Sequence, residues 1–460
     1  MPRALHGLAA LRSLLAPRSV AVIGASPTPA SMGARTLANL QGFPGRVFPV
    51  NGRYTEIGGR RCFATLADLP GTPDVAIIAL AKDRVEQAVA DCAARGVGAV
   101  VIYAAGYAET QEVEGAAAQA RLAAIGREAG MRVVGPNCAG LADLRRGMVL
   151  GFPEFPASVA NGRAIGLVSQ SGALGLALAQ AAQRGVALSH VLTSGNSCDV
   201  DVADWVAALA ESGDCAAIAL CWEGGAPRDR LVEAGRIAAA RGVRIAACRL
   251  GLSVLGAEQA LFHTGSVVAP AEDFTGLCAE AGFVPVQRIE ALIETAGFLA
   301  KAPARPLARG VGIASGSGGT AILAVDAASR HGVAVPAPAA ETVAKLRAAL
   351  PAFAAPRNPC DATAQVTANP QVLRGVVDAL LGDPAIGALV CPWGKAYRSD
   401  NIAFLGEAAR RNGKPVCLVW MSQWLEGPGV IEAEAEPDVA VFRSLDSCLA
   451  AVAAWMAQAR

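Results

Sequence analysis

The sequence is poor in the features that mark metal-binding, nucleic-acid-binding and membrane proteins. Its twelve cysteines are scattered singly without a C-x-x-C pair, and we predict no metal site in this chain. Basic and acidic side chains nearly balance, at 40 against 39, so neither nucleic acid nor an acidic membrane surface is expected as a partner. No apolar run approaches about 18 residues without glycine or charge, so no membrane span is predicted. A small molecule in the reducing cytoplasm is the expected partner.

What the sequence does contain is enough apolar residues for several cores. Of its 460 residues 53% are hydrophobic, and 50 glycines and 27 prolines indicate many tight turns. At about 150 residues each, roughly three domains are expected. Apolar, β-branched runs alternate with amphipathic stretches through residues 18–150, which predicts a parallel sheet with helices on both faces. The runs are 19–23, 47–50, 75–80, 99–103 and 132–135.

The first predicted strand leads into a loop of small residues. This loop runs from Gly24 to Gly33 and precedes a helix-like stretch over 34–40. A helix N-terminus at the carboxyl end of a strand presents free backbone N–H groups and favours a phosphate. Ser26 stands where G-x-G-x-x-G has its second glycine, so a dinucleotide fingerprint is not supported. Loops after the fourth and fifth strands are expected to line the same crevice, at 106–109 and 135–138.

The rest of the chain repeats one pattern twice. Residues 164–184 and 310–330 both contain a strand, an S-x-S-G turn and a helix that ends in Ala-Ala-x-Arg. Self-similarity of this kind predicts the same fold in both copies. Later segments also correspond, 196–199 with 358–361 and 221–224 with 391–394.

Irregular sequence over 141–162 and a Pro/Ala-rich stretch over 301–306 separate the units. We therefore predict an α/β protein with a Rossmann-like domain followed by two repeated flavodoxin-like domains. Their expected limits are 1–150, 160–300 and 308–460.

Ionisable residues distinguish the two copies of the repeat. Glu223 has Trp393 as its counterpart, and His263 has no histidine counterpart in the second copy. A single histidine is more often structural than reactive. The other three histidines are explained by a terminal segment, a strand and a helix end, whereas His263 is expected in a loop of small residues.

If the two similar domains face each other, their S-x-S-G turns would bring two helix N-termini to one point. Both helix dipoles would oppose an imidazolium cation but would favour a phosphoryl group on His263. A carboxylate such as Glu223 would then orient the ring. The phosphate-binding residues predicted on this basis are Ser169, Gln170, Ser171 and Gly172, and Ser315, Gly316, Ser317 and Gly318.

Taken together and in order, these motifs resemble the NDP-forming acyl-CoA synthetases, relatives of succinyl-CoA synthetase. The resemblance extends over essentially the whole chain, and the set is specific although each motif alone is weak. The motifs are Gly24 to Gly33, Pro49-Val50-Asn51, Gly135-Pro136-Asn137, Ser169 to Gly175, Gly195-Asn196 with Asp199-Val200-Asp201, Glu223-Gly224, His263-Thr264-Gly265, and Asn358-Pro359 with Asp361.

This resemblance implies a function for each part of the chain. It implies that His263 is transiently phosphorylated with Glu223 as its partner, and that coenzyme A converts an acyl phosphate into a thioester. It also implies ATP or ADP with Mg²⁺. The residues that it assigns to coenzyme A are Gly24, Ala25, Ser26, Met32, Gly33, Asn51 and Asn137.

The sequence departs from the family pattern in three respects. Phe262 replaces a serine, Arg249-Leu250-Gly251 replaces Lys-Ser-Gly, and the three domains leave no length for an ATP-grasp module. We therefore expect a separate ATP-grasp subunit and an oligomer. A non-catalytic or regulatory protein that binds coenzyme A or acyl-CoA is the alternative, and a coenzyme A transferase is a third.

The sequence leaves the carboxylic acid open. Trp222, Trp393 and Tyr397 are candidates for an acyl pocket near the repeat interface, and equally for core residues.

Overall fold

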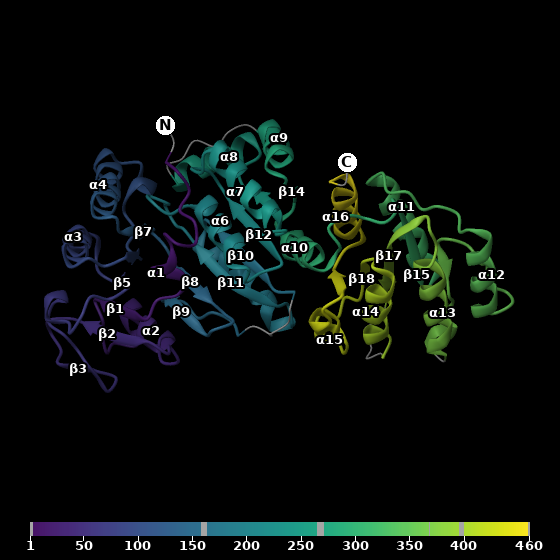
Figure 1. Ribbon diagram of the computed structural model, residues 1–460, viewed down its shortest axis with the longest axis horizontal. Coiled ribbons are helices and arrows are strands. Elements are labelled where there is room, and N and C mark those ends of the chain that lie inside the picture. The colour runs from purple at the N-terminus through teal and green to yellow at the C-terminus, as the bar shows by residue number, and fades with distance from the viewer. Residues whose placement is uncertain (1–2, 158–162, 265–270, 368, 395–399, 459–460) are drawn as a thin grey trace.

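A computed structural model shows three α/β units in a row (Figure 1). Each unit contains five parallel strands. When these strands are counted along the chain within their own unit, they lie side by side in the order 2-1-3-4-5. This is the doubly wound order of flavodoxin-like sheets, and the first unit, expected to be Rossmann-like, has it too. The predicted fold class is confirmed. The structure describes residues 3–157, 163–264, 271–367, 369–394 and 400–458, without the side chains of 261–264, 271–273 and 367.

The first sheet forms from the five runs that the sequence predicted. Because side chains alternate along a strand, Ala76 and Ile78 pack under helices on one face while Val75 and Ile77 face the second unit. Its strands are β1 (Ser19–Ile23), β2 (Arg46–Val50), β5 (Val75–Ile78), β6 (Ala99–Ile102) and β7 (Arg132–Val134), with a small hairpin of β3 (Glu56–Ile57) and β4 (Arg60–Arg61), and its helices are α2 (Met32–Asn39), α3 (Val85–Arg95) and α4 (Val113–Ala129).

The second sheet is wider than expected. Strands β8 (Gly140–Asp143) and β9 (Met148–Gly151) form an antiparallel hairpin, and β8 pairs with β11 (Leu188–Thr193). The sequence predicts an irregular stretch here, with the first domain ending at residue 150. Strands of four residues are too short to show a clear alternation, which is why the hairpin was missed.

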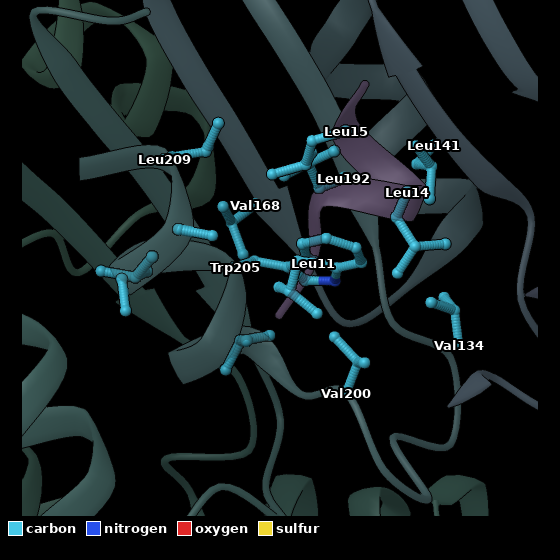
Figure 2. Packing of buried hydrophobic residues seen from close by; sticks show 14 of the residues in the cluster. Leu11, Leu14, Leu15, Val134, Leu141, Val168, Leu192, Val200, Trp205 and Leu209 are labelled. Atoms are coloured by element: carbon cyan, nitrogen blue, oxygen red, sulfur yellow. The ribbon is translucent and has the colours of Figure 1, made fainter. Parts of the chain in front are cut away.

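The N-terminal segment also packs on the second unit. Helix α1 (Arg12–Leu15) places Leu11 and Leu14 against Trp205 and Val134 in one buried cluster (Figure 2). Arg3 pairs with Asp204 at 2.6 Å. The N-terminal segment therefore joins the first two units.

The second unit carries the first copy of the repeat. Its remaining strands are β10 (Ile165–Ser169), β12 (Ala217–Trp222), β13 (Arg244–Arg249) and β14 (Val284–Pro285), and its helices are α5 (Gly172–Ala179), α6 (Val202–Ser212), α7 (Arg228–Ala240), α8 (Val254–Thr264), α9 (Ala271–Ala281) and α10 (Leu292–Lys301).

The third unit repeats the topology of the second. The order β14-β13-β12-β10-β11 corresponds to β19-β18-β17-β15-β16, so the prediction of one fold used twice is confirmed. Its strands are β15 (Gly310–Ser315), β16 (Cys360–Asp361), β17 (Ile386–Trp393), β18 (Val416–Trp420) and β19 (Val439–Phe442), and its helices are α11 (Gly318–Arg330), α12 (Ala340–Ala349), α13 (Pro370–Leu381), α14 (Asn401–Asn412), α15 (Val430–Ala435) and α16 (Leu445–Ala457).

The two copies share one core. Helices α10 and α16, which follow the last strand of each copy, lie between the two sheets in Figure 1. Phe298 on α10 packs against Phe442 and against Trp455 on α16, with ring centroids 6.0 and 5.7 Å apart. The copies therefore face each other through equivalent helices.

A buried carboxyl lies in this shared interface. Glu294 on α10 is 7% exposed, and its Oε1 accepts a hydrogen bond from the backbone N–H of Arg443 at 3.1 Å. Burial raises the pKa of the Glu294 carboxyl to about 7, and the nearby Glu434 adds to this rise while Arg184 and Arg443 oppose it. Between about pH 4.5 and 7, the Glu294 carboxyl is thus protonated in the folded protein and ionised in the unfolded chain.

Stability is therefore expected to fall as pH rises from about 4.5 to about 7, by about 3 kcal/mol in the limit. Glu294→Gln keeps an oxygen for the Arg443 N–H and removes the charge. We expect it to raise the melting temperature at pH 8 and to change it much less at pH 5, as measured by calorimetry. Glu290→Gln, at an exposed position, is the control. An equal shift at both pH values would contradict this account.

No helix in the described parts of the chain is long and apolar enough to cross a bilayer.

Candidate functional site

The carboxyl ends of β1, β2 and β5 surround a cavity of about 400 Å³. Gly24, Ser26 and Thr28 line it from the first loop, and Arg53 and Arg84 add two guanidinium groups from the next loops. Parallel sheets of this order bind ligands at this switch point. Backbone N–H groups, hydroxyls and two arginines are the donors that a diphosphate needs.

Two glycines allow the loop to lie close against its neighbours. Gly24 adopts φ +90°, and a Cβ there would lie 2.3 Å from the carbonyl oxygen of Ala79. A Cβ on Gly33 would lie 2.2 Å from the carbonyl oxygen of Gly24, so α2 begins directly on this loop. Ser31 caps α2 by accepting a hydrogen bond from the N–H of Ala34 at 3.2 Å. The cavity, called the Gly24 cavity below, therefore offers hydrogen-bond donors to a phosphate group.

A second cavity of about 540 Å³ lies between the first and second units. Leu80 lines both cavities, so they are neighbours. Tyr103 and Phe152, in edge contact at 4.9 Å between centroids, form part of its apolar wall. Six of the residues predicted from sequence line this cavity: Met32, Asn137, Gln170, Ser171, Gly172 and Glu223.

Glu223 is held at this cavity by the turn before α5. It follows the last residue of β12 and is 7% exposed. Its backbone N–H and that of Gly224 donate to Oε1 of Gln170, at 2.9 and 3.2 Å. The sequence-predicted carboxylate and the N-terminus of α5 thus meet in one cavity, next to the predicted coenzyme A site.

The repeated serines act mainly within their own turns. Ser169 Oγ donates to the carbonyl oxygen of Ser171 at 2.7 Å, and Ser315 Oγ donates to that of Ser317 at 2.9 Å. Ser171 Oγ accepts from the N–H of Leu174 at 3.3 Å and caps α5. These turns therefore present mainly backbone N–H groups to a ligand.

The two turns line different cavities in the described structure. Gly316 and Ser317 line a cavity of about 480 Å³ in the third unit, which shares no described lining residue with the cavity that holds Glu223. A carboxylate oxygen of Asp361 also lies beside Gly318, 3.1 Å from the position of a Cβ there. The described residues of the two turns thus border no common cavity, and the cradle of two converging helices stays a prediction. The sequence repeat predicted that both copies carry the same turn, but it did not predict that the two turns line different cavities.

His263 lies near the end of α8, not in a loop as expected. The apolar residues of 254–262 continue the helical period up to it, and this outweighed the small residues that follow. Its side chain, and residues 265–270, lie outside the described part of the structure.

The three other histidines each lie beside an aspartate. Nε2 of His6, His190 and His331 lies 3.0, 3.5 and 2.9 Å from a carboxylate oxygen of Asp199, Asp143 and Asp446 respectively. Each of these three imidazoles therefore has a carboxylate partner of its own.

Comparison with known proteins agrees with this architecture. Residues 18–143 match the family model described as a CoA binding domain, and residues 162–299 match the succinyl-CoA ligase like flavodoxin domain. Over 443 residues the chain is 30% identical to the α subunit of ADP-forming acetate–CoA ligase II of Pyrococcus furiosus, covering 92% of this chain and 94% of that subunit. The chain belongs to the ADP-forming acyl-CoA ligase family.

Other members of this acid–thiol ligase family are longer. The chain is 35% identical to a trans-feruloyl-CoA synthase from an unknown prokaryotic organism, with 82% of this chain and 54% of that protein aligned. It is 32% identical to ADP-forming acetate–CoA ligase I of Archaeoglobus fulgidus, with 78% and 51% aligned. The chain therefore spans about half the length of these two relatives.

A solved structure supports the same relationship. The acetyl-coenzyme A synthetase 1 of Ca. Korarchaeum cryptofilum, in complex with phosphate and ADP, superposes with a TM-score of 0.85 at 26% identity. The match covers 98% of this chain and 97% of that one.

In this member of the family, some of the residues predicted from the sequence are packed inside the protein. Ala25 is fully buried. The side-chain amide of Asn51 donates a hydrogen bond to the carbonyl oxygen of Ala25 at 2.7 Å. Asn51 also borders the Gly24 cavity. Of the aspartates in the family motif, Asp199 lies beside the imidazole of His6, and Asp201 forms an ion pair with Arg230. Arg53 and Arg84 were missed, although basic residues shortly after two predicted strands were a usable signal.

In the residues that the structure describes, no group of three or more His, Cys, Asp or Glu side chains is placed to hold a metal ion.

Proposed function

We propose that this chain is the coenzyme A-binding, phosphohistidine-bearing subunit of an ADP-forming acyl-CoA ligase. It would join a carboxylic acid to coenzyme A with ATP, releasing ADP and phosphate, through an acyl phosphate. A separate ATP-grasp subunit would bind the nucleotide with Mg²⁺. The observation that carries the proposal is the cavity where Glu223 and the start of α5 meet, beside the Gly24 cavity.

The residues of this chain have distinct roles in the proposed reaction. His263 would receive the phosphoryl group, and Glu223 would orient its ring through one nitrogen. The acid's carboxylate oxygen would then attack phosphorus and break the N–P bond. The thiol sulfur of coenzyme A would attack the acyl carbonyl carbon, and phosphate would leave.

Relatives support the assembly but leave the acid open. Two of them are named as α subunits, which favours a partner subunit here as well. Relatives are named for acetate, 4-hydroxybutyrate and trans-ferulate, acids of different size. All twelve cysteines are free, which supports the expected cytoplasmic location.

The experiment is a ligase assay of the chain with its nucleotide-binding subunit, acid, coenzyme A and ATP. Glu223→Gln keeps the shape and the backbone bonds to Gln170 but removes the charge that would orient the imidazole. We expect kcat to fall by about 10²-fold, which corresponds to a few kcal/mol of lost positioning.

Glu233→Gln, on the exposed side of α7, is the matched control and should leave turnover unchanged. Equal turnover of Glu223→Gln and wild type would contradict the assigned role. Coenzyme A binding without ADP formation in the assembled complex would instead favour a non-catalytic binding protein.

A further inference from the structure

A chain of hydrogen-bonded side chains crosses the joint between the first and second units. It begins in the first unit with Glu109, after β6, and with Gln119 on α4. It continues to Asn196 in the loop after β11 and from there to Asn137 in the loop after β7. Both asparagines line the cavity that holds Glu223. The chain therefore connects the first unit to the wall of this cavity.

The backbone of the first unit fixes two acceptors in this chain. The N–H groups of Gly106 and Tyr107 donate to the carboxylate oxygens of Glu109, at 2.6 and 3.0 Å. The N–H group of Ala108 donates to Oε1 of Gln119 at 3.3 Å. A carboxylate can only accept hydrogen bonds, and the oxygen of the Gln119 amide is already on the side of an N–H donor. Both side chains therefore present oxygen atoms to their next neighbour.

These oxygens determine the orientation of the Asn196 side chain. Its Nδ2 donates to the Glu109 carboxylate and also to Oε1 of Gln119, the second bond at 2.9 Å. Both N–H groups of the amide are thus used, and its Oδ1 accepts a hydrogen bond from Nδ2 of Asn137 at 3.3 Å. A flipped amide would place Oδ1 against the Glu109 carboxylate, two acceptors without a proton between them. The oxygen of Asn196 is therefore held on the side of Asn137.

Backbone hydrogen bonds hold the two asparagines close together. The N–H of Asn196 donates to the carbonyl oxygen of Pro136 at 2.9 Å. The N–H of Cys198 donates to the carbonyl oxygen of Gly135 at 3.1 Å. Because the backbone is fixed on both sides of the joint, Glu109 controls the orientation of the side-chain amide and not the position of the loop.

We propose that Glu109 is a positioning residue for coenzyme A that acts through Asn196. By fixing this amide, it makes the side-chain oxygens of Asn196 and Asn137 available to the amide N–H groups of the pantetheine arm. The arm contains two amides, so it brings two N–H donors that need acceptors. An asparagine oxygen has two lone pairs, so Oδ1 of Asn196 can accept from the ligand as well as from Asn137.

The position of the cavity suits this part of coenzyme A. The cavity shares Leu80 with the Gly24 cavity and also holds Glu223, so it extends from the proposed phosphate site to the proposed reaction site. Coenzyme A with its phosphates at the first site has to cross this cavity for its thiol to react at the second. The inference thus rests on the proposed function and deepens it by naming residues that hold the arm.

Glu109→Gln tests the positioning role by calorimetry on the full chain. Glutamine has the same length but brings an NH₂ group, which cannot accept from the N–H donors around Glu109. We expect the Kd for coenzyme A to rise by about 10-fold or more, as the loss of one or two amide hydrogen bonds predicts. The Kd for 3′-phosphoadenosine 5′-diphosphate, which has the same phosphates but no pantetheine arm, should change by less than about 2-fold.

Two further variants separate positioning from folding. Asn137→Gly removes one acceptor at an exposed position whose φ of +57° suits glycine, so the backbone is preserved. It should weaken coenzyme A binding with the same selectivity, and it decides the question alone if Glu109→Gln does not fold. Glu112→Gln removes a charge from an exposed position nearby and should leave both affinities unchanged.

The comparison of the two ligands makes each outcome decisive. An equal loss of affinity for both ligands in Glu109→Gln would show a role in folding alone and would overturn the proposal. Unchanged coenzyme A affinity in Glu109→Gln or in Asn137→Gly would overturn it as well. Binding of neither ligand to the wild type would refute the proposed coenzyme A site itself, and this inference with it.

Discussion

With its nucleotide-binding partner and ATP, the wild-type chain is expected to acquire a phosphoryl label that is labile in acid and stable in base, and His263→Ala is expected to acquire none. A phosphohistidine needs a nucleophilic imidazole, hydrogen-bond donors for the phosphoryl oxygens and a group that orients the ring. Nε2 of His6, His190 and His331 each lies beside an aspartate carboxylate, and His263 is the histidine that the family resemblance assigns to this role. Overall turnover should fall by about 10³-fold or more, because no other group would carry the phosphoryl.

The label also has to react as an intermediate. Coenzyme A together with the acid should discharge it from the wild type, and either alone should not complete the reaction to acyl-CoA. His331→Ala is the control, since His331 lies on the third unit beside Asp446. Stoichiometric labelling of His263→Ala would end the phosphohistidine proposal.

Reversal of two charges at the Gly24 cavity is expected to remove coenzyme A binding. Arg53 and Arg84 both line this cavity and are exposed enough to change without disturbing the core. If each guanidinium contacts a phosphate, each such bond is worth about 1.5–3 kcal/mol. Arg53→Glu with Arg84→Glu should therefore raise the Kd for coenzyme A by about 10²-fold or more, as measured by calorimetry.

The same cavity offers a second variant and a control. Gly24→Glu should also remove binding, but its Cβ would press on the carbonyl oxygen of Ala79, so it alters the loop as well as the charge. Arg127→Glu, exposed on α4, reverses one charge at a distance from the cavity. Coenzyme A affinity that survives the double reversal would place the phosphates elsewhere.

The sequence by itself determined the architecture, because the patterns that encode it are local. The runs at 19–23 and 99–103 form β1 and β6, and the matched segments 164–184 and 310–330 fold into the same strand, turn and helix. Hydrophobic alternation and turn residues act over a few positions, so they can be read without knowledge of distant contacts. The same holds for the meeting of Glu223 with the turn at Ser171, since both stand at carboxyl ends of neighbouring strands.

Only the tertiary structure decided what lies across from each strand end. Copies related by sequence were expected to bring two turns together, whereas the shared core on α10 and α16 leaves Ser171 and Ser317 in different cavities. The pairing of the hairpin over 140–151 with β11 and the packing of the N-terminal segment on the second unit were likewise hidden. Each depends on packing between residues far apart in the chain, and no local pattern encodes how two separately formed surfaces dock.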